Sequence, residues 1–147
     1  MKRLAVNRRA RVDYQIKDRF EAGIVLTGRE VKSVKKGQIS LKEAFVQITP
    51  QEEAFLINCH ISPYQKGRDG DPRQSRKLLL KKNELKSLLG KVRQGLTIIP
   101  LSCYLKRGLV KLEIGLAKRK KKADRRHDLK QQAQERDIRT ELKRSSS

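Results

Sequence analysis

The sequence has few of the residues that usually mark catalytic, metal-binding or membrane sites. It contains two histidines and two cysteines in 147 residues. Neither cysteine belongs to a C-x-x-C pair of the kind that holds zinc, and no nucleotide-binding, hydrolase or zinc-protease motif occurs. No apolar run approaches the roughly 20 residues of a membrane-spanning helix, and residues 1–7 lack a signal-peptide core. We therefore expect a cytoplasmic protein with no catalytic residues, metal, cofactor or membrane partner.

The two cysteines lie far apart, in apolar stretches of the chain. Cys59 and Cys103 are therefore expected to be buried thiols that pack as small hydrophobic side chains in a reducing compartment. One catalytic alternative remains at this point, a nuclease built on Asp69, Asp71 and Glu21. It is the weaker interpretation, because most carboxylates in this sequence stand beside basic residues and simply balance their charge.

Acidic residues are also scarce relative to basic ones. There are 16 Asp and Glu against 37 Lys and Arg, which gives a formal net charge of +21 and a pI near 10.5. Self-repulsion of this size favours a polyanionic partner, and nucleic acid fits better than a membrane. The basic residues form four clusters: Arg8, Arg9 and Arg11; Lys32, Lys35 and Lys36; Arg68, Arg73, Arg76 and Lys77; and Lys118 to Lys122.

Aromatic residues number only six, three Tyr and three Phe, with no Trp. Most of them fall at positions expected to be buried, which argues against a protein that binds single strands by stacking on bases. No helix-turn-helix, zinc finger or zipper is present to enter the major groove of DNA. The composition therefore favours recognition of folded RNA.

Short alternating apolar runs predict a mainly β fold. In the first run Tyr14, Ile16, Phe20, Ala22, Ile24 and Leu26 share one parity, and Asp18 interrupts it, which predicts a long strand with a bulge near Asp18. Four more strands are expected over residues 38–48, 54–61, 96–105 and 109–116, and a long loop over 62–77. Together they predict a small antiparallel OB-like barrel with two or three short helices.

Two helices have clear signals. Thr27 and Glu30 have capping-box spacing, and Gly37 can end the helix that they begin. Residues 83–94 carry apolar side chains at helical spacing, and Gly95 can terminate this second helix.

The C-terminal segment differs in composition from the rest. We predict an RNA-binding barrel over residues 1–116 and a basic tail over 117–147, in which 12 basic and five acidic residues occur without any aromatic. A segment with so little to bury is expected to be disordered when free and to become helical on an anionic surface. A tail that merely aids solubility is the open alternative.

Several phrases of the sequence occur in the order typical of one family. The phrases are Asn7-Arg8-Arg9-Ala10-Arg11, Phe20 to Gly28, Glu30 to Ser33, Asp71-Pro72-Arg73, Arg76 to Leu80, Pro100-Leu101 and Gly115-Leu116-Ala117. In this order they resemble the SsrA-binding protein family, also called small protein B (SmpB), and the likeness runs from about Leu4 into the tail.

The resemblance implies binding to the tRNA-like domain of transfer-messenger RNA and rescue of stalled ribosomes by trans-translation. It places RNA contacts at Asn7, Glu21, Leu79 and Lys81, with phosphates held by Arg8, Arg11, Lys32, Arg76 and Lys77. Leu79 could instead belong to the core. In the tail the family's ribosome-contacting segments match Lys118, Lys120, Lys121, Asp124, Arg125 and Arg126.

The expected partners are therefore transfer-messenger RNA and the ribosome, at the decoding site and the mRNA path. The protein is expected to act as a monomer. The alternative function is that of a structural ribosomal protein whose basic tail threads ribosomal RNA. A small RNA-processing enzyme is a third, weaker interpretation.

Overall fold

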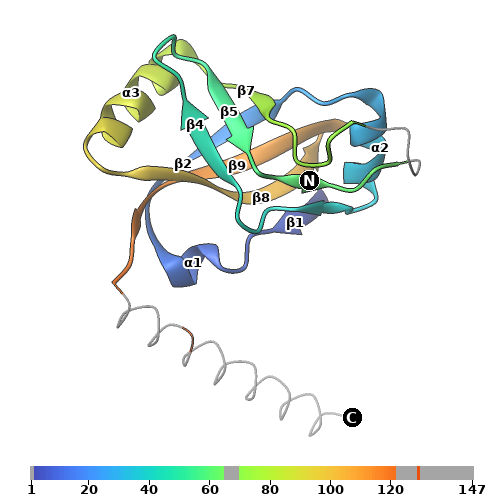
Figure 1. Ribbon diagram of the computed structural model, residues 1–147, viewed down its shortest axis with the longest axis horizontal. Coiled ribbons are helices and arrows are strands. Elements are labelled where there is room, and N and C mark those ends of the chain that lie inside the picture. The colour runs from blue at the N-terminus through green and yellow to red at the C-terminus, as the bar shows by residue number, and fades with distance from the viewer. Residues whose placement is uncertain (1, 65–69, 122–128, 130–147) are drawn as a thin grey trace, which may run out of the picture.

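The chain folds into a closed antiparallel barrel with helices at its ends (Figure 1). The computed structural model describes residues 2–64, 70–121 and 129. The elements in chain order are β1 (Lys2–Val6), α1 (Ala10–Asp13), β2 (Tyr14–Ile24), α2 (Gly28–Lys35), β3 (Ile39–Ser40), β4 (Phe45–Ile48), β5 (Ala54–Ile57), β6 (His60–Ile61), β7 (Arg76–Leu79), α3 (Lys82–Arg93), β8 (Thr97–Lys106) and β9 (Leu109–Arg119).

The barrel closes because β8 and β9 pair with each other as well as with their other neighbours. Around the ring the order is β8, β4, β5, β7, β2 and β9, and β1 extends the sheet along β8. Strands β3 and β6 form a separate two-stranded sheet. Helices α2 and α3 lie at opposite ends of the barrel (Figure 1). The predicted antiparallel barrel and short helices are confirmed.

The barrel interior is filled by aliphatic side chains from the alternating strands. Leu56, Ile98, Leu112 and Ile114 are fully buried there, and Leu88 of α3 closes one end. Such alternation buries one face of each strand and leaves the other for solvent or ligands. The outside of the barrel is therefore the surface on which a partner can bind.

A bulge in β2 divides its apolar residues between two clusters. The pairing with β9 shifts register between Ile16 and Asp18, which confirms the predicted bulge. The extra residue at the bulge turns the side chains before it to the opposite side of the sheet from Phe20 and Ala22. Tyr14 and Ile16 therefore pack outside the barrel, against Ala10, Ile99, Leu101 and Ala117. The prediction that they share the buried face of Phe20 and Ala22 was wrong.

Gly115 permits a close approach within this outer cluster. A Cβ atom at this position would lie 2.9 Å from Cδ1 of Leu101 and 3.3 Å from Cγ2 of Ile16, so a larger residue would force these side chains to shift. The absence of a side chain lets both apolar groups cover β9. The phrase Gly115-Leu116-Ala117 therefore reflects packing.

The two predicted helices are confirmed with small changes in their bounds. The Thr27 hydroxyl accepts from the N–H of Glu30, whose carboxylate accepts from the N–H of Thr27, so the capping box is complete. Gly37 has a φ of +77° after α2, and Gly95 has a φ of +95° after α3. Helix α1 is only four residues long and was not given a separate prediction.

Several strand boundaries differ from the prediction. The expected strands 38–48 and 54–61 are each divided into two, and β7 begins at Arg76, inside the expected loop 62–77. At the other end β9 continues to Arg119, so the barrel extends three residues past the predicted boundary at 116. No helix among the described residues is long and apolar enough to cross a membrane.

Candidate nucleic-acid interface

The outer surface of β2 carries alternating polar side chains beyond its bulge. Arg19, Glu21 and Gly23 face outward, because Phe20 and Ala22 between them pack against the core. Glu113 of β9 lies opposite Glu21 and pairs with the guanidinium of Arg19 at 3.3 Å. Charged groups of both signs thus lie along one exposed strand.

A hollow of about 320 Å³ at one end of this strand collects the N-terminal basic residues. Its lining includes Asn7, Arg8, Arg11 and Arg19, together with Arg3. The Asn7 side-chain amide donates to the Pro100 carbonyl at 2.9 Å. Arg8 and Arg11 are exposed, so their guanidinium groups are available for phosphates. Three of the predicted RNA-binding residues therefore share one site.

Glu21 is held by two neighbours on the hairpin of β8 and β9. The hydroxyl of Tyr104 donates to Oε2 of Glu21 at 2.5 Å, and Nζ of Lys106 lies 3.3 Å from the same oxygen. The pKa of the Glu21 carboxyl is lowered, chiefly by the hydrogen bond from Tyr104. Glu21 is therefore a carboxylate at neutral pH, ready to accept hydrogen bonds.

Leu79 extends the same outer face from the neighbouring strand. It lies opposite Gly23 in the register of β2 and β7, and its side chain is 55% exposed. The ideal Cβ of an alanine at position 23 would lie 3.3 Å from Cβ of Leu79, so the glycine lets Leu79 lie close to β2. The alternative that Leu79 belongs to the core is excluded by its exposure.

We call the residues Asn7, Arg8, Arg11, Arg19, Glu21 and Leu79 the outer face. Lys77 and Lys81 flank Leu79 and are exposed. Nζ of Lys77 lies 3.5 Å from Glu53, a solvent-exposed pair that an RNA phosphate can displace at little cost.

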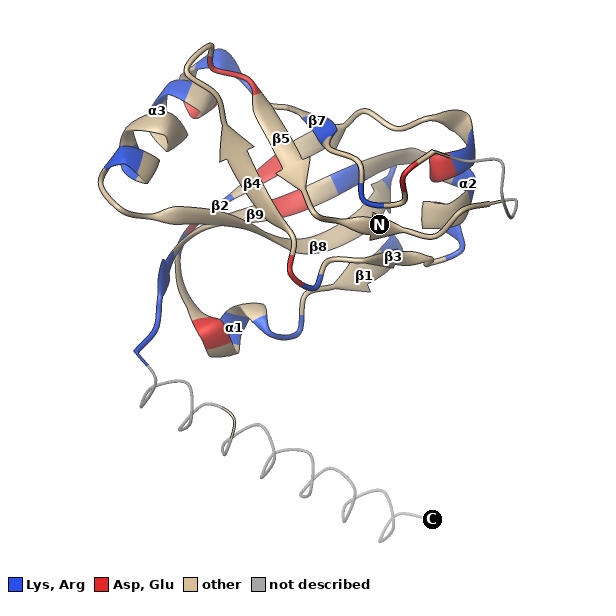
Figure 2. Ribbon diagram, viewed as in Figure 1, with Lys and Arg blue, Asp and Glu red and all other residues tan. Residues whose placement is uncertain are grey.

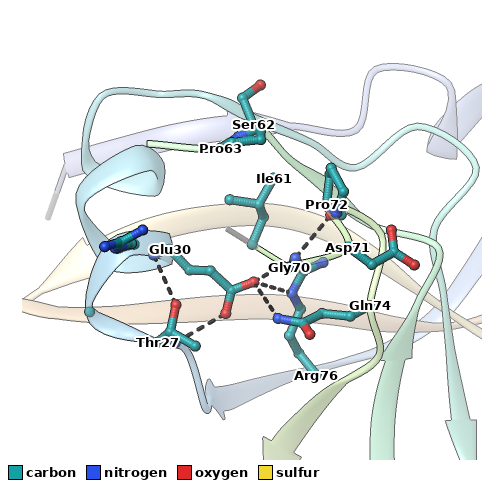
Figure 3. A pocket seen from close by; sticks show the side chains of 12 residues that line it. Thr27, Glu30, Ile61, Ser62, Pro63, Gly70, Asp71, Pro72, Gln74 and Arg76 are labelled. Atoms are coloured by element: carbon teal, nitrogen blue, oxygen red, sulfur yellow. Dashed lines mark hydrogen bonds and ion pairs between the residues drawn. The ribbon is translucent and has the colours of Figure 1, made fainter. Parts of the chain in front are cut away.

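Arg76 is not available for RNA, and its predicted role in holding phosphate was wrong. It is 3% exposed and donates to Oε2 of Glu30 from both Nε and Nη2, at 2.8 and 2.5 Å. It also donates to the carbonyls of Cys59 and Pro72. Figure 3 shows the contacts of Arg76 with Glu30 and Pro72, beside the Gln74 amide and the capping Thr27. Arg76 thus ties α2 to the segment before β7.

Lys32 lies away from the outer face. Its Nζ is 5.2 Å from the ring centre of Tyr64, and Nζ of Lys36 is 5.0 Å from the same ring. These cation–π contacts belong to α2, at the end of the barrel opposite α3 (Figure 1). The structure therefore separates Lys32 from the predicted site around Glu21. Figure 2 shows basic residues on all three helices, with acidic residues among them.

The predicted tail residues divide between the barrel and the region beyond it. Lys118 belongs to β9 and pairs with Gln15, and Lys120 donates from its N–H and Nζ to the carbonyls of Asp13 and Arg11. Lys121 is exposed. Asp124, Arg125 and Arg126 lie outside the described residues.

Some residues of this surface escaped the sequence analysis. Arg19, Tyr104 and Lys106 were not selected, although each touches a predicted residue or lines its hollow. The Lys106-Arg107-Gly108 triplet is a local signal for a basic hairpin tip, with positive φ at both Arg107 and Gly108. Tyr104 had no such signal, because its partner is 83 positions away.

The cysteines lie inside the barrel, as predicted. Burial raises the pKa of the Cys59 thiol to about 11 and that of Cys103 to about 12, so both stay protonated at neutral pH. Within residues 2–64, 70–121 and 129, no group of three or more potential ligands is placed to hold a metal ion.

A closed basic barrel with a polar, arginine-rich outer face defines an OB-like nucleic-acid-binding protein. Comparison with known proteins narrows this class. The model of the SmpB protein family matches residues 4–144. The chain belongs to the SmpB protein family.

Relatives and a solved structure agree with this assignment. The chain is 52% identical to the SsrA-binding protein of Coprothermobacter proteolyticus, over 98% of this chain and 96% of the relative. It is 46% identical to the SsrA-binding protein of Acaryochloris marina, over 95% of this chain and 93% of the relative. A structure described as "tmRNA-SmpB: a journey to the center of the bacterial ribosome" superposes with a TM-score of 0.68 and 48% identity, over 80% of this chain and 85% of that one.

Proposed function

We propose that this protein binds the tRNA-like domain of transfer-messenger RNA and delivers it to stalled ribosomes for trans-translation. The observation that carries the proposal is the family match over residues 4–144. A solved relative that covers most of the chain is described with tmRNA and the bacterial ribosome. The outer face supplies a surface with suitable chemistry for folded RNA.

Binding on the outer face would combine two kinds of contact. Arg8, Arg11 and Arg19 hold phosphates around the hollow at the N-terminal end, and these contacts position the RNA. Glu21 accepts from an amine on an exposed base edge, and Leu79 packs against an unstacked base. Asn7 is fixed between β1 and α1 by its bond to Pro100 and lines the hollow.

The basic C-terminal segment would contact the ribosome. The first of the predicted tail contacts, Lys118 and Lys120, are part of the folded body, so we assign the ribosome contacts to Lys121 and the residues that follow, including Asp124, Arg125 and Arg126. A highly charged segment that leaves the barrel near Arg11 can reach ribosomal RNA while the outer face holds its own RNA. The protein then acts in the cytoplasm by binding, and no bond is made or broken.

Capture of cellular RNA tests the RNA partner. Tagged full-length protein is purified from cells and the bound RNA is sequenced. One tRNA-like species should dominate, with ribosomes present in amounts well below one per protein and enriched for stalled complexes. Stoichiometric recovery of all ribosomal RNA without a tRNA-like species would instead identify a structural ribosomal protein.

Truncation tests the tail separately. A chain that ends after Lys121 keeps all of β9 and both contacts of Lys120 with α1. It should bind the tRNA-like RNA with unchanged affinity and fail to tag peptides on stalled ribosomes. Full tagging by this variant would remove the tail from the mechanism, whereas lost RNA binding would show that the outer face is incomplete without it.

A further inference from the structure

The side chain of Tyr104 links strand β8 to Glu21 of strand β2. It lies on β8 opposite Lys111 of β9, and its hydroxyl reaches Glu21 on β2 beyond β9. The residue is 5% exposed, although Lys106 at the end of β8 and Arg107 in the following turn are exposed. Tyr104 is therefore buried as a whole, and its hydroxyl contacts a carboxylate that is itself partly exposed.

The two oxygens of Glu21 are not equivalent. Oε2 accepts from the Tyr104 hydroxyl at 2.5 Å and lies 3.3 Å from Nζ of Lys106. Oε1 lies 3.4 Å from the same ammonium group, a long contact. The Glu21 side chain stays 40% exposed. Of the two oxygens, Oε1 is the one that retains capacity to accept from a ligand.

A carboxylate in this position needs such a restraint. Lys106 contacts the carboxylate, and the charges of both Lys106 and Lys111 lower the pKa of Glu21. Lysine ammonium groups are mobile point charges and do not fix a direction for the oxygen that they contact. A rigid tyrosine with a short hydrogen bond does fix one.

We propose that Tyr104 is a positioning residue for RNA recognition, because its hydroxyl holds Oε2 of Glu21 and thereby turns Oε1 toward an N–H donor on the RNA. This inference rests on the proposed RNA-binding function and adds a specificity-determining residue to it. Tyr104 does not touch the RNA in this arrangement. It acts through the carboxylate.

The protonation states suit this role. Burial raises the pKa of the Tyr104 hydroxyl, and the hydrogen bond to Glu21 raises it further. The hydroxyl therefore remains a donor, and the carboxyl remains ionised, across the neutral range. The hydrogen bond is not lost on a small change of pH.

Tyr104→Phe removes the hydroxyl and keeps the ring. Affinity of the full chain for a transcript of the tRNA-like domain should fall roughly tenfold, as expected for loss of a well-oriented charged hydrogen bond. Binding to an unrelated RNA duplex at the same salt concentration should not change. In a Glu21→Gln background the same substitution should have no further effect. Tyr14→Phe, in the second apolar cluster, is the matched control and should bind like wild type.

A second measurement does not depend on RNA. The pKa of the Glu21 carboxyl, followed by NMR, should rise in Tyr104→Phe, because the largest contribution that lowers it is gone. A structural role in packing alone would leave this value unchanged.

Three results distinguish the possibilities. Equal losses for specific and unrelated RNA with a lower melting temperature would make Tyr104 a packing residue, and additive losses with Glu21→Gln would show that it acts independently. Either one overturns the inference and leaves RNA binding intact. If wild-type protein itself shows no preference for the tRNA-like transcript, the proposed function fails and the inference fails with it.

Discussion

Two glutamates of this protein accept short hydrogen bonds at very different depths. Glu30 is 9% exposed and meets Arg76, itself 3% exposed, inside the structure. The Glu21 side chain is 40% exposed and meets Tyr104 and Lys106 at the surface. The comparison shows that the depth of the carboxylate separates a buried structural pair from an exposed group that a ligand can reach, which is the role we propose for Glu21.

The buried pair of Glu30 and Arg76 stabilises the fold only when both charges and their hydrogen bonds are present. The Arg76 guanidinium donates to Glu30 and to the carbonyls of Cys59 and Pro72, which offsets the cost of removing both charges from water. Loss of one partner leaves the other charge buried. At Glu21 no such penalty exists, because water can replace either neighbour.

The largest expected effect is on stability at the buried pair. Arg76→Met should lower the free energy of unfolding by about 3–5 kcal/mol, because it leaves the Glu30 carboxylate buried without its cation. Lys77→Met, at the adjacent exposed position, is the matched control and should change stability little. Urea unfolding measures both. Equal stability of the two variants would contradict the difference between buried and exposed pairs.

The next effect is on binding at the exposed carboxylate. Glu21→Lys should weaken binding to the tRNA-like domain roughly tenfold, the equivalent of ~1.4 kcal/mol. Binding to an unrelated duplex should become tighter, because the substitution adds positive charge. Filter binding at one fixed salt concentration compares the two RNAs. If both affinities rise together, Glu21 makes no base contact.

A smaller loss is expected at the helix cap beside the buried pair. Thr27→Ala removes the hydroxyl that accepts from the N–H of Glu30 and should cost ~1 kcal/mol of stability. RNA binding at the outer face should not change. Thermal unfolding and filter binding on the same sample test both parts, and a variant that binds RNA more weakly would link α2 to recognition.

The smallest effect is on the pH dependence of stability. Burial raises the pKa of the Glu30 carboxyl, but the N–H of Thr27 and the Arg76 guanidinium outweigh it, so the pKa lies below its ordinary value of 4.5. A carboxyl with a lowered pKa contributes stability above 4.5 and loses it as pH falls through its folded value. Glu30→Gln should flatten this acid limb of the stability curve. An unchanged limb would mean that other carboxylates account for it.

Local patterns of the sequence predicted the local parts of the fold. The capping box of Thr27 and Glu30 and the alternation of Val110, Leu112 and Ile114 each depend on neighbours a few positions away, and both were confirmed. Strand β7 was missed because its first residue, Arg76, is buried only through Glu30, 46 positions earlier. Without that contact, the charged residues at the start of this short apolar run indicate a loop more than a strand.

The candidate site could also be predicted only in part, because some of its contacts join residues far apart in the sequence. The family phrases identified Asn7, Glu21 and Leu79, which the structure places on one outer face. Composition alone could not separate Arg76 from Arg8, since both stand in basic clusters. Tyr104 could not be found at all, because its contact with Glu21 depends on the closure of the barrel by β8, β9 and β2.

The central claim is that RNA binds to the outer face of β2 and its neighbours. Backbone amide NMR during titration with the tRNA-like transcript tests it most directly. The account predicts that shifts concentrate at Asn7 to Arg11, Arg19 to Gly23 and Leu79, with little change in the buried contacts of Arg76. Shifts confined to α2 and α3, with β2 unaffected, would contradict it.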